Sequence, residues 1–273
     1  MTEKLIEELQ RIGLTLNAKK TKILKSNPDI DDYSLNVVEI GDEFVKVMKD
    51  TDSHRYLGRL LCTSASDRVK IEVCNRRRAA WASFHKHKSV LLDHHVSLQL
   101  RLKFFDACVG SSIFFGMGVF PMTRGQIEDM DRLQRRMLRR IVGWRRIDGE
   151  DWKDTMKRMK IRLERGQDLH YCQPWSISFA RNQWRYVHHV INGNLLMWSR
   201  VMCKYNFHPI NDPASPFLPR RSVGHPRLRW DDHIHNFCWK ICPEFRGRHW
   251  FDILSNHYLD DYEDEYVLYI VDL

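Results

Sequence analysis

The sequence predicts an α+β fold that is mostly α-helical, with a small strand-containing N-terminal part and a long helical remainder. Two observations lead to this prediction. β-branched runs and turn signals are concentrated in about the first sixty residues, and apolar residues recur at helical spacing after residue 64. The chain has 273 residues, of which 43% are hydrophobic, so it contains enough apolar material to form a core. We therefore expect one or two folded domains.

Four short elements are expected in the N-terminal part. Residues 2–12 form an amphipathic helix, which Gly13 ends, and residues 21–26 form a strand. Residues 36–47 contain two β-branched runs around a Gly-Asp pair, which is the sequence of a hairpin with a two-residue turn. A further short strand is expected at residues 55–61.

The remainder of the chain is predicted to be helical. Helices are expected over residues 64–92, 97–119, 124–142, 177–203 and 224–273. The helix over 124–142 is the most clearly marked, because Thr123 and Gln126 have the spacing of a capping box and Gly143 follows its last apolar residue. Its core positions are predicted to be Ile127, Met130, Leu133, Met137, Leu138 and Ile141.

These elements suggest three parts. Residues 1–62 form the small α/β part, residues 63–160 a basic helical region, and residues 161–273 a helical C-terminal region. A loop with four prolines near residues 209–219 has the composition of a linker within the last part.

The chain is basic, with 44 Lys and Arg against 35 Asp and Glu, a net charge of +9 and a pI near 9.2. Such an excess suits a polyanionic partner such as nucleic acid, although a basic protein without such a partner would have the same composition. No secretory signal and no apolar run long enough to cross a bilayer are found. The seven cysteines are expected to be reduced thiols. The expected location is the cytoplasm or the nucleus, and neither secretion nor membrane insertion is predicted.

The densest charge lies in residues 132–162, which hold twelve Lys and Arg against four acidic residues. On a helix, five of the arginines form one stripe beside the apolar face: Arg132, Arg135, Arg136, Arg139 and Arg140. A phosphate backbone would neutralise such a stripe, and Arg145 and Arg146 would extend it. Trp144 is positioned to stack on an unpaired base. The alternative is a solvated face that pairs with the protein's own carboxylates. An earlier basic face is expected from Arg76, Arg77, Arg78, Lys86 and Lys88.

No metal site is predicted. Residues of ligand type are present near the C-terminal end: Cys203, His208, His233, His235, Cys238 and Cys242. Their spacings are not those of a zinc finger, so buried thiols and surface histidines are the favoured interpretation. Asp231 and Asp232 are adjacent, and we interpret them as acids at the start of a helix. A metal enzyme built on this pair and the nearby histidines is kept as the third hypothesis.

Several segments occur in an order that resembles reverse transcriptases of non-LTR (LINE-type) retrotransposons. The matching stretches are GLTLNAKKTKIL (13–24), the hairpin at 36–47, HRYLGRLL (54–61), RLKFFDACV (101–109), DRLQRRMLRRIVGWRRI (131–147) and GHPRLRWDDHI (224–234). The resemblance implies a partial palm over residues 1–62 and a thumb-like region over 63–160. It covers residues 1–160 well and residues 220–240 as a separate patch.

The resemblance also implies roles for individual residues. Lys20 matches the lysine that assists the pyrophosphate leaving group, and Tyr56, Leu57 and Gly58 match the primer grip. RNA and RNA–DNA duplex are the implied partners, held by the arginine stripe. The family works with Mg²⁺ held by aspartates that include a YADD-type pair. That pair is expected upstream of residue 1, since the Asp-Asp pairs at 31–32, 231–232 and 260–261 have another context.

The sequence thus favours a truncated reverse-transcriptase-like protein that binds nucleic acid and cannot polymerise. No cofactor is expected for this chain alone, and Lys20 would be idle without the aspartates. The alternative is a non-catalytic structural or protein-interaction domain, in which the basic helices contact acidic proteins or simply pack.

Overall fold

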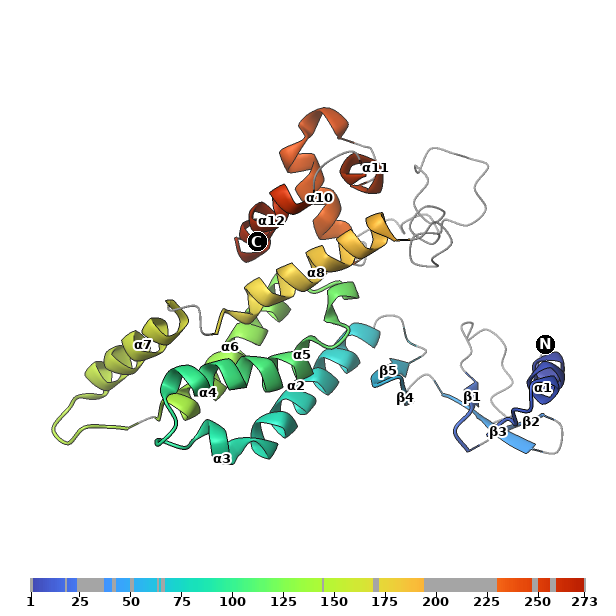
Figure 1. Cartoon of the computed structure of the whole chain (residues 1–273), viewed down its shortest axis with the longest axis horizontal. Coiled ribbons are helices and arrows are strands. Elements are labelled where there is room, and N and C mark those ends of the chain that lie inside the picture. Colours follow the sequence, from blue (N-terminus) through green and yellow to red (C-terminus); the bar gives the residue numbers. More distant parts are fainter. Residues whose placement is uncertain are drawn as a thin grey trace. The chain divides into compact units, whose positions relative to one another are not determined.

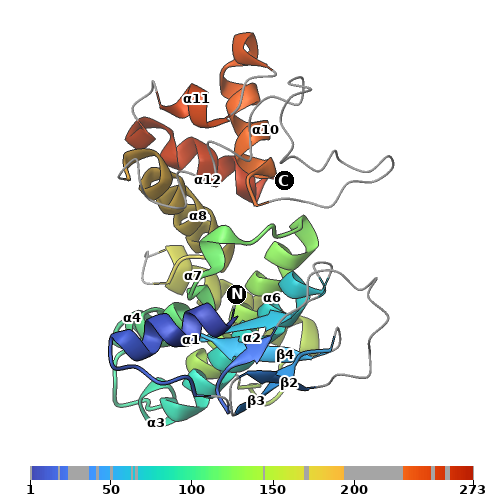
Figure 2. The same ribbon diagram turned by 90° about the vertical axis from the view of Figure 1, so that its right-hand side faces the viewer.

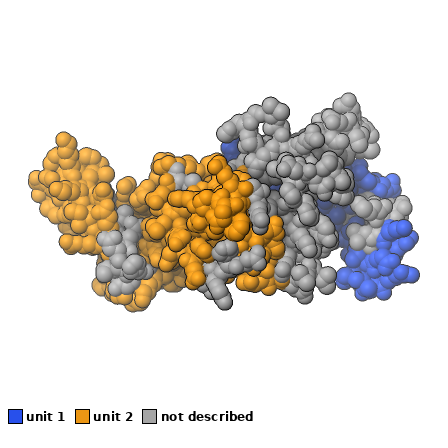
Figure 3. Space-filling model, turned by 90° about the horizontal axis from the view of Figure 1, so that it is seen from above, with its two compact units in different colours: residues 1–75 blue, residues 76–273 orange. Residues whose placement is uncertain are grey.

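The structure is a computed structural model, and it describes residues 2–17, 19–23, 37–40, 43–49, 52–62, 64, 67–143, 145–168, 172–193, 230–246, 250–255 and 259–272 (Figure 1). It is α+β and mostly helical, as the sequence predicts. The chain divides into two compact units, residues 1–75 and residues 76–273 (Figure 3). The three-part division expected from the sequence stays a prediction.

The described part of the first unit begins with a helix and a three-stranded sheet, whose elements are α1 (Thr2–Arg11), β1 (Lys22–Ile23), β2 (Val37–Ile40) and β3 (Glu43–Val47). The strand order is β1-β3-β2, with β1 parallel and β2 antiparallel to β3. Val45 is fully buried, and Ile6 of α1 and Val38 of β2 pack against it. The predicted helix and hairpin are therefore confirmed. The hairpin turn and residues 24–26 of the predicted strand lie outside the described residues.

The prediction of a single strand over residues 55–61 is wrong. Two strands form there instead, β4 (Ser53–Tyr56) and β5 (Arg59–Cys62), paired antiparallel as a separate hairpin. Leu57 and Gly58 make its two-residue turn, and both have positive φ, at 47° and 81°. Two positive φ angles give the turn the twist of the flanking strands, which Gly58 accepts without a steric penalty.

Helices make up most of the described part of the second unit. The bounds are α2 (Arg68–Lys86, which begins in the first unit), α3 (Lys88–Leu91), α4 (Leu98–Phe105), α5 (Ser111–Phe114), α6 (Arg124–Val142), α7 (Trp152–Asp168), α8 (Trp175–Asn192), α10 (Asp232–Ile241), α11 (Trp250–Leu254) and α12 (Glu263–Val271). Three 3₁₀ turns, Met117–Val119, Pro243–Phe245 and Leu259–Tyr262, and one π-helical turn, Asp106–Gly110, complete the described elements of this unit.

The continuous helix expected over residues 97–119 is also interrupted. A π-helical turn at Asp106–Gly110 joins α4 to α5, and the helix ends where Phe115 turns extended and Gly116 adopts a φ of 68°. Gly116 is well suited to this left-handed conformation because it has no Cβ. The predicted helix over 177–203 begins earlier, at Trp175, and residues 194–203 lie outside the described part, as does the proline-containing loop at 209–219.

The core of the second unit is built around α8, which runs between α6 and the C-terminal helices (Figure 1). Trp184 of α8 stacks on Tyr266 of α12, with ring centroids 4.8 Å apart, and meets the edge of Phe237 of α10 at 5.7 Å. At the other end of α8, Trp175 stacks on Phe105 of α4 at 5.9 Å. All five of these rings are buried. Aromatic packing therefore joins α8 to helices from both sides of the sequence.

The ends of α6 are those that the sequence predicts. The Thr123 hydroxyl accepts a hydrogen bond from the Gln126 backbone N–H, and the Gln126 side chain accepts one from the Thr123 backbone N–H. Gly143 follows the last helical residue with a φ of 79°. The six predicted core positions of this helix are all buried.

We expect Thr123→Ala to lower the free energy of unfolding by about 1 kcal/mol, the usual contribution of an N-cap hydroxyl. For a domain of this size the melting temperature should fall by about 2–4 °C. Thr123→Ser keeps the hydroxyl and serves as the control in the same thermal melt. Equal melting temperatures for the alanine and serine variants would contradict the capping role.

Candidate nucleic-acid interface

Three hydrogen bonds from buried or half-buried side chains hold α6 against the start of α8. The Gln134 amide donates to the Gln173 carbonyl at 2.7 Å and accepts from the Trp175 backbone N–H at 3.1 Å. Asp131 accepts from the Ser176 backbone N–H at 2.8 Å, so a carboxylate lies at the positive N-terminus of α8. The apolar face of α6 is thereby fixed inward, and its arginine stripe faces outward.

All five arginines of the predicted stripe are exposed, but they differ in their surroundings. Arg132 pairs within its own helix, with Glu128 at 2.9 Å and Asp129 at 2.7 Å. Arg140 lies over the ring of Trp81 in α2, with its guanidinium carbon 4.9 Å from the ring centroid. Arg132 therefore fits the alternative interpretation, in which the exposed face pairs with the protein's own carboxylates.

The central arginines of the stripe are Arg135, Arg136 and Arg139. Within the described part of the chain, their side chains make no ion pair and no hydrogen bond. Like charges one turn apart repel each other, although cations in the last turns of a helix also gain from its dipole. We call these three residues the α6 cation cluster. It is the part of the stripe with charge left to bind an external anion.

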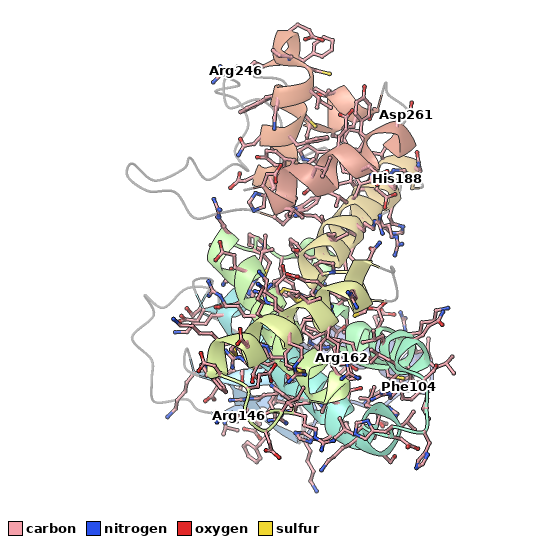
Figure 4. All side chains as sticks on the ribbon, turned by 90° about the vertical axis from the view of Figure 1, so that its left-hand side faces the viewer. Phe104, Arg146, Arg162, His188, Arg246 and Asp261 are labelled. Carbon is pink, nitrogen blue, oxygen red and sulfur yellow. The ribbon has the colours of Figure 1, made fainter. Side chains whose placement is uncertain are left out.

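The predicted continuation of the stripe lies only partly within the described residues. Trp144 lies outside the described residues. Arg145 and Arg146 are exposed, and Arg146 donates to the Glu150 carbonyl at 3.3 Å in the loop before α7. Figure 4 labels Arg146 in this loop and Arg162 on α7. The prediction of a basic face on α2 is wrong for Arg76. This residue is buried, and its guanidinium carbon lies 5.2 Å from the centroid of the Phe115 ring.

A bidentate ion pair fixes the start of α7. Arg158 Nε and Nη2 donate to the two carboxylate oxygens of Glu150, each at 2.8 Å, and the Thr155 hydroxyl donates to the same carboxylate. These hydrogen bonds favour the charged form and lower the pKa of Glu150 to about 2. The loop between α6 and α7 is thus held by charge.

This pair predicts a pH dependence of stability. A carboxyl whose folded pKa is depressed contributes its full stabilisation above the unfolded value of about 4.3 and loses it as the pH falls toward 2. We therefore expect the difference in melting temperature between the wild type and Glu150→Gln to be largest near pH 6. It should shrink progressively between pH 4 and pH 2. A difference that stays constant over that interval would contradict the assignment.

An open groove of about 970 Å³ separates α7 from the first turns of α4. Leu98, Leu102 and Ile161 supply its apolar lining. Its rim carries charges of both signs: Glu150, Asp154, Lys157, Arg158, Arg162 and Arg165. No aromatic ring lines it among the described residues, so it offers no surface on which a base could stack.

The residues matched to polymerase roles lie in the first unit. Lys20 is exposed in the turn after α1, where its backbone N–H donates to the Asn17 carbonyl at 3.0 Å. Tyr56 and Leu57 are 59% and 77% exposed at the tip of the β4–β5 hairpin, and Gly58 completes that turn. The primer-grip-like residues therefore form a protruding turn where the sequence predicted a strand. Their role and that of Lys20 stay predictions.

The candidate metal ligands near the C-terminus have structural partners where they are described. His233 Nε2 lies 2.8 Å from the Met122 carbonyl, and Asp231 accepts from the Trp250 indole N–H at 3.1 Å. Burial raises the pKa of the Cys238 thiol to about 12. His235, Cys242 and Asp232 lie on or next to α10, and Cys203 and His208 lie outside the described residues. Over the described ranges, no three His, Cys, Asp or Glu side chains converge on one point.

One stretch has the letters of a Tyr-x-Asp-Asp motif, Tyr258-Leu259-Asp260-Asp261, and its context argues against a catalytic pair. Residues Leu259–Tyr262 form a 3₁₀ turn that leads into α12. The stretch also follows every segment that resembles the polymerase family, whereas the YADD-type pair precedes them in that family. The interpretation of the 260–261 pair as lying in another context stays a prediction, and Tyr258 lies outside the described residues.

Comparison with known proteins gives one informative similarity. The chain is 24% identical over 242 residues to a Caenorhabditis elegans protein described as uncharacterized and transposon-derived, covering 86% of this chain and 76% of that one. This similarity is consistent with an origin in a transposable element and does not specify the type of element. No family model matches the sequence, and no solved structure matches it. None of the described helices is both long and apolar enough to cross a membrane.

Proposed function

We propose that the chain is a reverse-transcriptase-like protein of a non-LTR retrotransposon that binds RNA and RNA–DNA duplex and does not polymerise. The observation that carries this proposal is the α6 cation cluster, because three exposed arginines on one ridge gain most from a phosphate backbone. The proposed family rests on the order of the sequence motifs. The similarity to a transposon-derived protein supports an origin in a transposable element. The expected place of action is the cytoplasm or the nucleus.

The absence of polymerisation follows from the chemistry of the family. Phosphoryl transfer of this kind needs aspartates that hold the metal ions, and none of the Asp-Asp pairs in the sequence has the required context. Lys20 would then have no reaction to assist. The proposed thumb-like and primer-grip-like segments would hold nucleic acid only.

The test compares binding with synthesis. Purified protein is titrated against a labelled primed RNA template, with polyglutamate of equal charge as competitor, and the same mixture is supplied with Mg²⁺ and deoxynucleotides. We expect RNA to bind more tightly than polyglutamate and the primer to stay at its original length. Primer extension would refute the non-catalytic assignment, and equal affinity for RNA and polyglutamate would refute the nucleic-acid function.

A protein-interaction function is the second candidate, and the α4–α7 groove favours it. The groove combines an aliphatic lining with the cations Lys157, Arg162 and Arg165, which suits an acidic amphipathic helix. If this function is the correct one, Arg162→Glu should abolish binding of a designed Leu/Glu-rich helical peptide and leave RNA binding unchanged.

A further inference from the structure

The contact between Arg140 of α6 and Trp81 of α2 continues to a third planar side chain, the exposed imidazole of His85. Trp81, which Arg140 covers, also stacks on His85 one turn later in α2, with ring centroids 5.7 Å apart and planes 25° apart. Trp81 is half-buried and His85 is exposed. The guanidinium, the indole and the imidazole therefore form a group of planar side chains whose outer member is open to solvent.

Further arginines lie on the faces of α2 and α6 that meet at this group. Arg77 and Arg78 precede Trp81 by four and three residues, so they lie on the same face of α2. On α6, Arg136 precedes Arg140 by one turn and belongs to the α6 cation cluster. Figure 2 shows α2 and α6 next to each other. The planar group thus lies where the basic faces of two helices meet.

We infer that His85, backed by Trp81, is a stacking site for an unpaired base of single-stranded RNA. Unpaired bases stack on aromatic and imidazole rings, while arginines beside the rings hold the flanking phosphates. Packing alone explains the Arg140–Trp81 contact, which joins two helices. It does not explain an exposed imidazole that stacks on the indole between two helices with basic faces. The inference rests on the proposed nucleic-acid function and names the form of nucleic acid that this surface prefers.

The test separates base recognition from phosphate attraction. Binding of a labelled twelve-residue oligouridylate is measured by anisotropy, and inorganic polyphosphate of the same length is used as competitor. The variants are His85→Ala, His85→Phe and, as the matched control, the exposed neighbour Lys86→Ala. We expect His85→Ala to weaken oligouridylate binding about fivefold or more, as for loss of one stacked base, and to leave polyphosphate binding unchanged. His85→Phe should restore the affinity, because it keeps a ring and carries no charge.

Three results would overturn the stacking site while the proposed function survives. The first is an unchanged oligouridylate affinity in His85→Ala, and the second is a failure of His85→Phe to restore binding that alanine has removed. The third is an equal loss of affinity for both ligands in His85→Ala, as expected for Lys86→Ala, which would show that the imidazole acts as a charge only. If the wild type binds neither RNA nor polyphosphate, the nucleic-acid function itself falls, and the stacking site with it.

Discussion

Replacing Arg135, Arg136 and Arg139 together with glutamine is expected to weaken binding of RNA by about ten- to a hundredfold at moderate salt. Each phosphate contact contributes roughly 0.7–0.9 to the slope of log K against log salt, so the slope should also fall by about 2–3. Arg140 is left in place because it packs on Trp81, and its loss would mix stability with binding. Fluorescence anisotropy at several salt concentrations measures both quantities.

A control with the same change in charge is available in the first unit. Lys4, Lys19 and Lys70 are exposed, and their joint replacement by glutamine also removes three positive charges. This control should lower the affinity only through net charge, by a small factor that is the same for every polyanion. If both triple variants lose the same affinity and the same salt slope, the α6 cation cluster is not the binding surface.

Arg101→Met is expected to have the largest effect on stability, lowering the free energy of unfolding by about 3 kcal/mol. Arg101 is only 4% exposed, and its guanidinium donates to the carbonyls of Val96 at 3.0 Å and Ile141 at 2.6 Å. The Ile141 carbonyl lies in the last turn of α6, so one cation caps the end of the helix that carries the arginine stripe. Methionine keeps much of the aliphatic volume and supplies no donor.

Chemical denaturation gives the stability, and RNA binding of the folded variant gives a second readout. The end of α6 near Arg139 should loosen, and we expect RNA affinity to fall several-fold at temperatures where the variant is still folded. Arg101→Lys should recover part of the stability, because an ammonium group can reach one of the carbonyls. Unchanged stability in Arg101→Met would show that the observed hydrogen bonds do not hold this end of α6.

The features that were predicted correctly from the sequence are local ones. The start of α6 depends on Thr123 and Gln126, and its end on Gly143, all within one turn of the helix ends. The helix α1 and the β2–β3 hairpin were likewise predicted from residues within or next to these elements. The predictions that were wrong concern breaks within apolar runs. Leu57 and Phe115 carry no turn signal of their own, and each precedes a glycine that was read as part of a regular element.

For the candidate site, the sequence predicts only which cationic residues belong to it. The spacing of the arginines predicts the stripe. It does not predict which of these arginines remain available to bind an external anion. Arg132 is neutralised by acids on its own helix, which the sequence could have shown at spacings of three and four residues. Trp81 and Arg140 are in contact although their residue numbers differ by 59, and Gln134 and Gln173 are in contact although theirs differ by 39. No local pattern contains such contacts, which is why the sequence does not predict that Trp81 and Arg140 meet. The stacking role of Trp144, which lies outside the described residues, stays a prediction.

Arginine footprinting tests the central claim most directly. The protein is treated with phenylglyoxal with and without a primed RNA template, and modification of each arginine is read by mass spectrometry. We predict that RNA protects Arg135, Arg136 and Arg139, while exposed Arg11 and Arg246 react as before. Equal modification of the three α6 arginines in the free protein and in a complex shown to contain RNA would contradict the account.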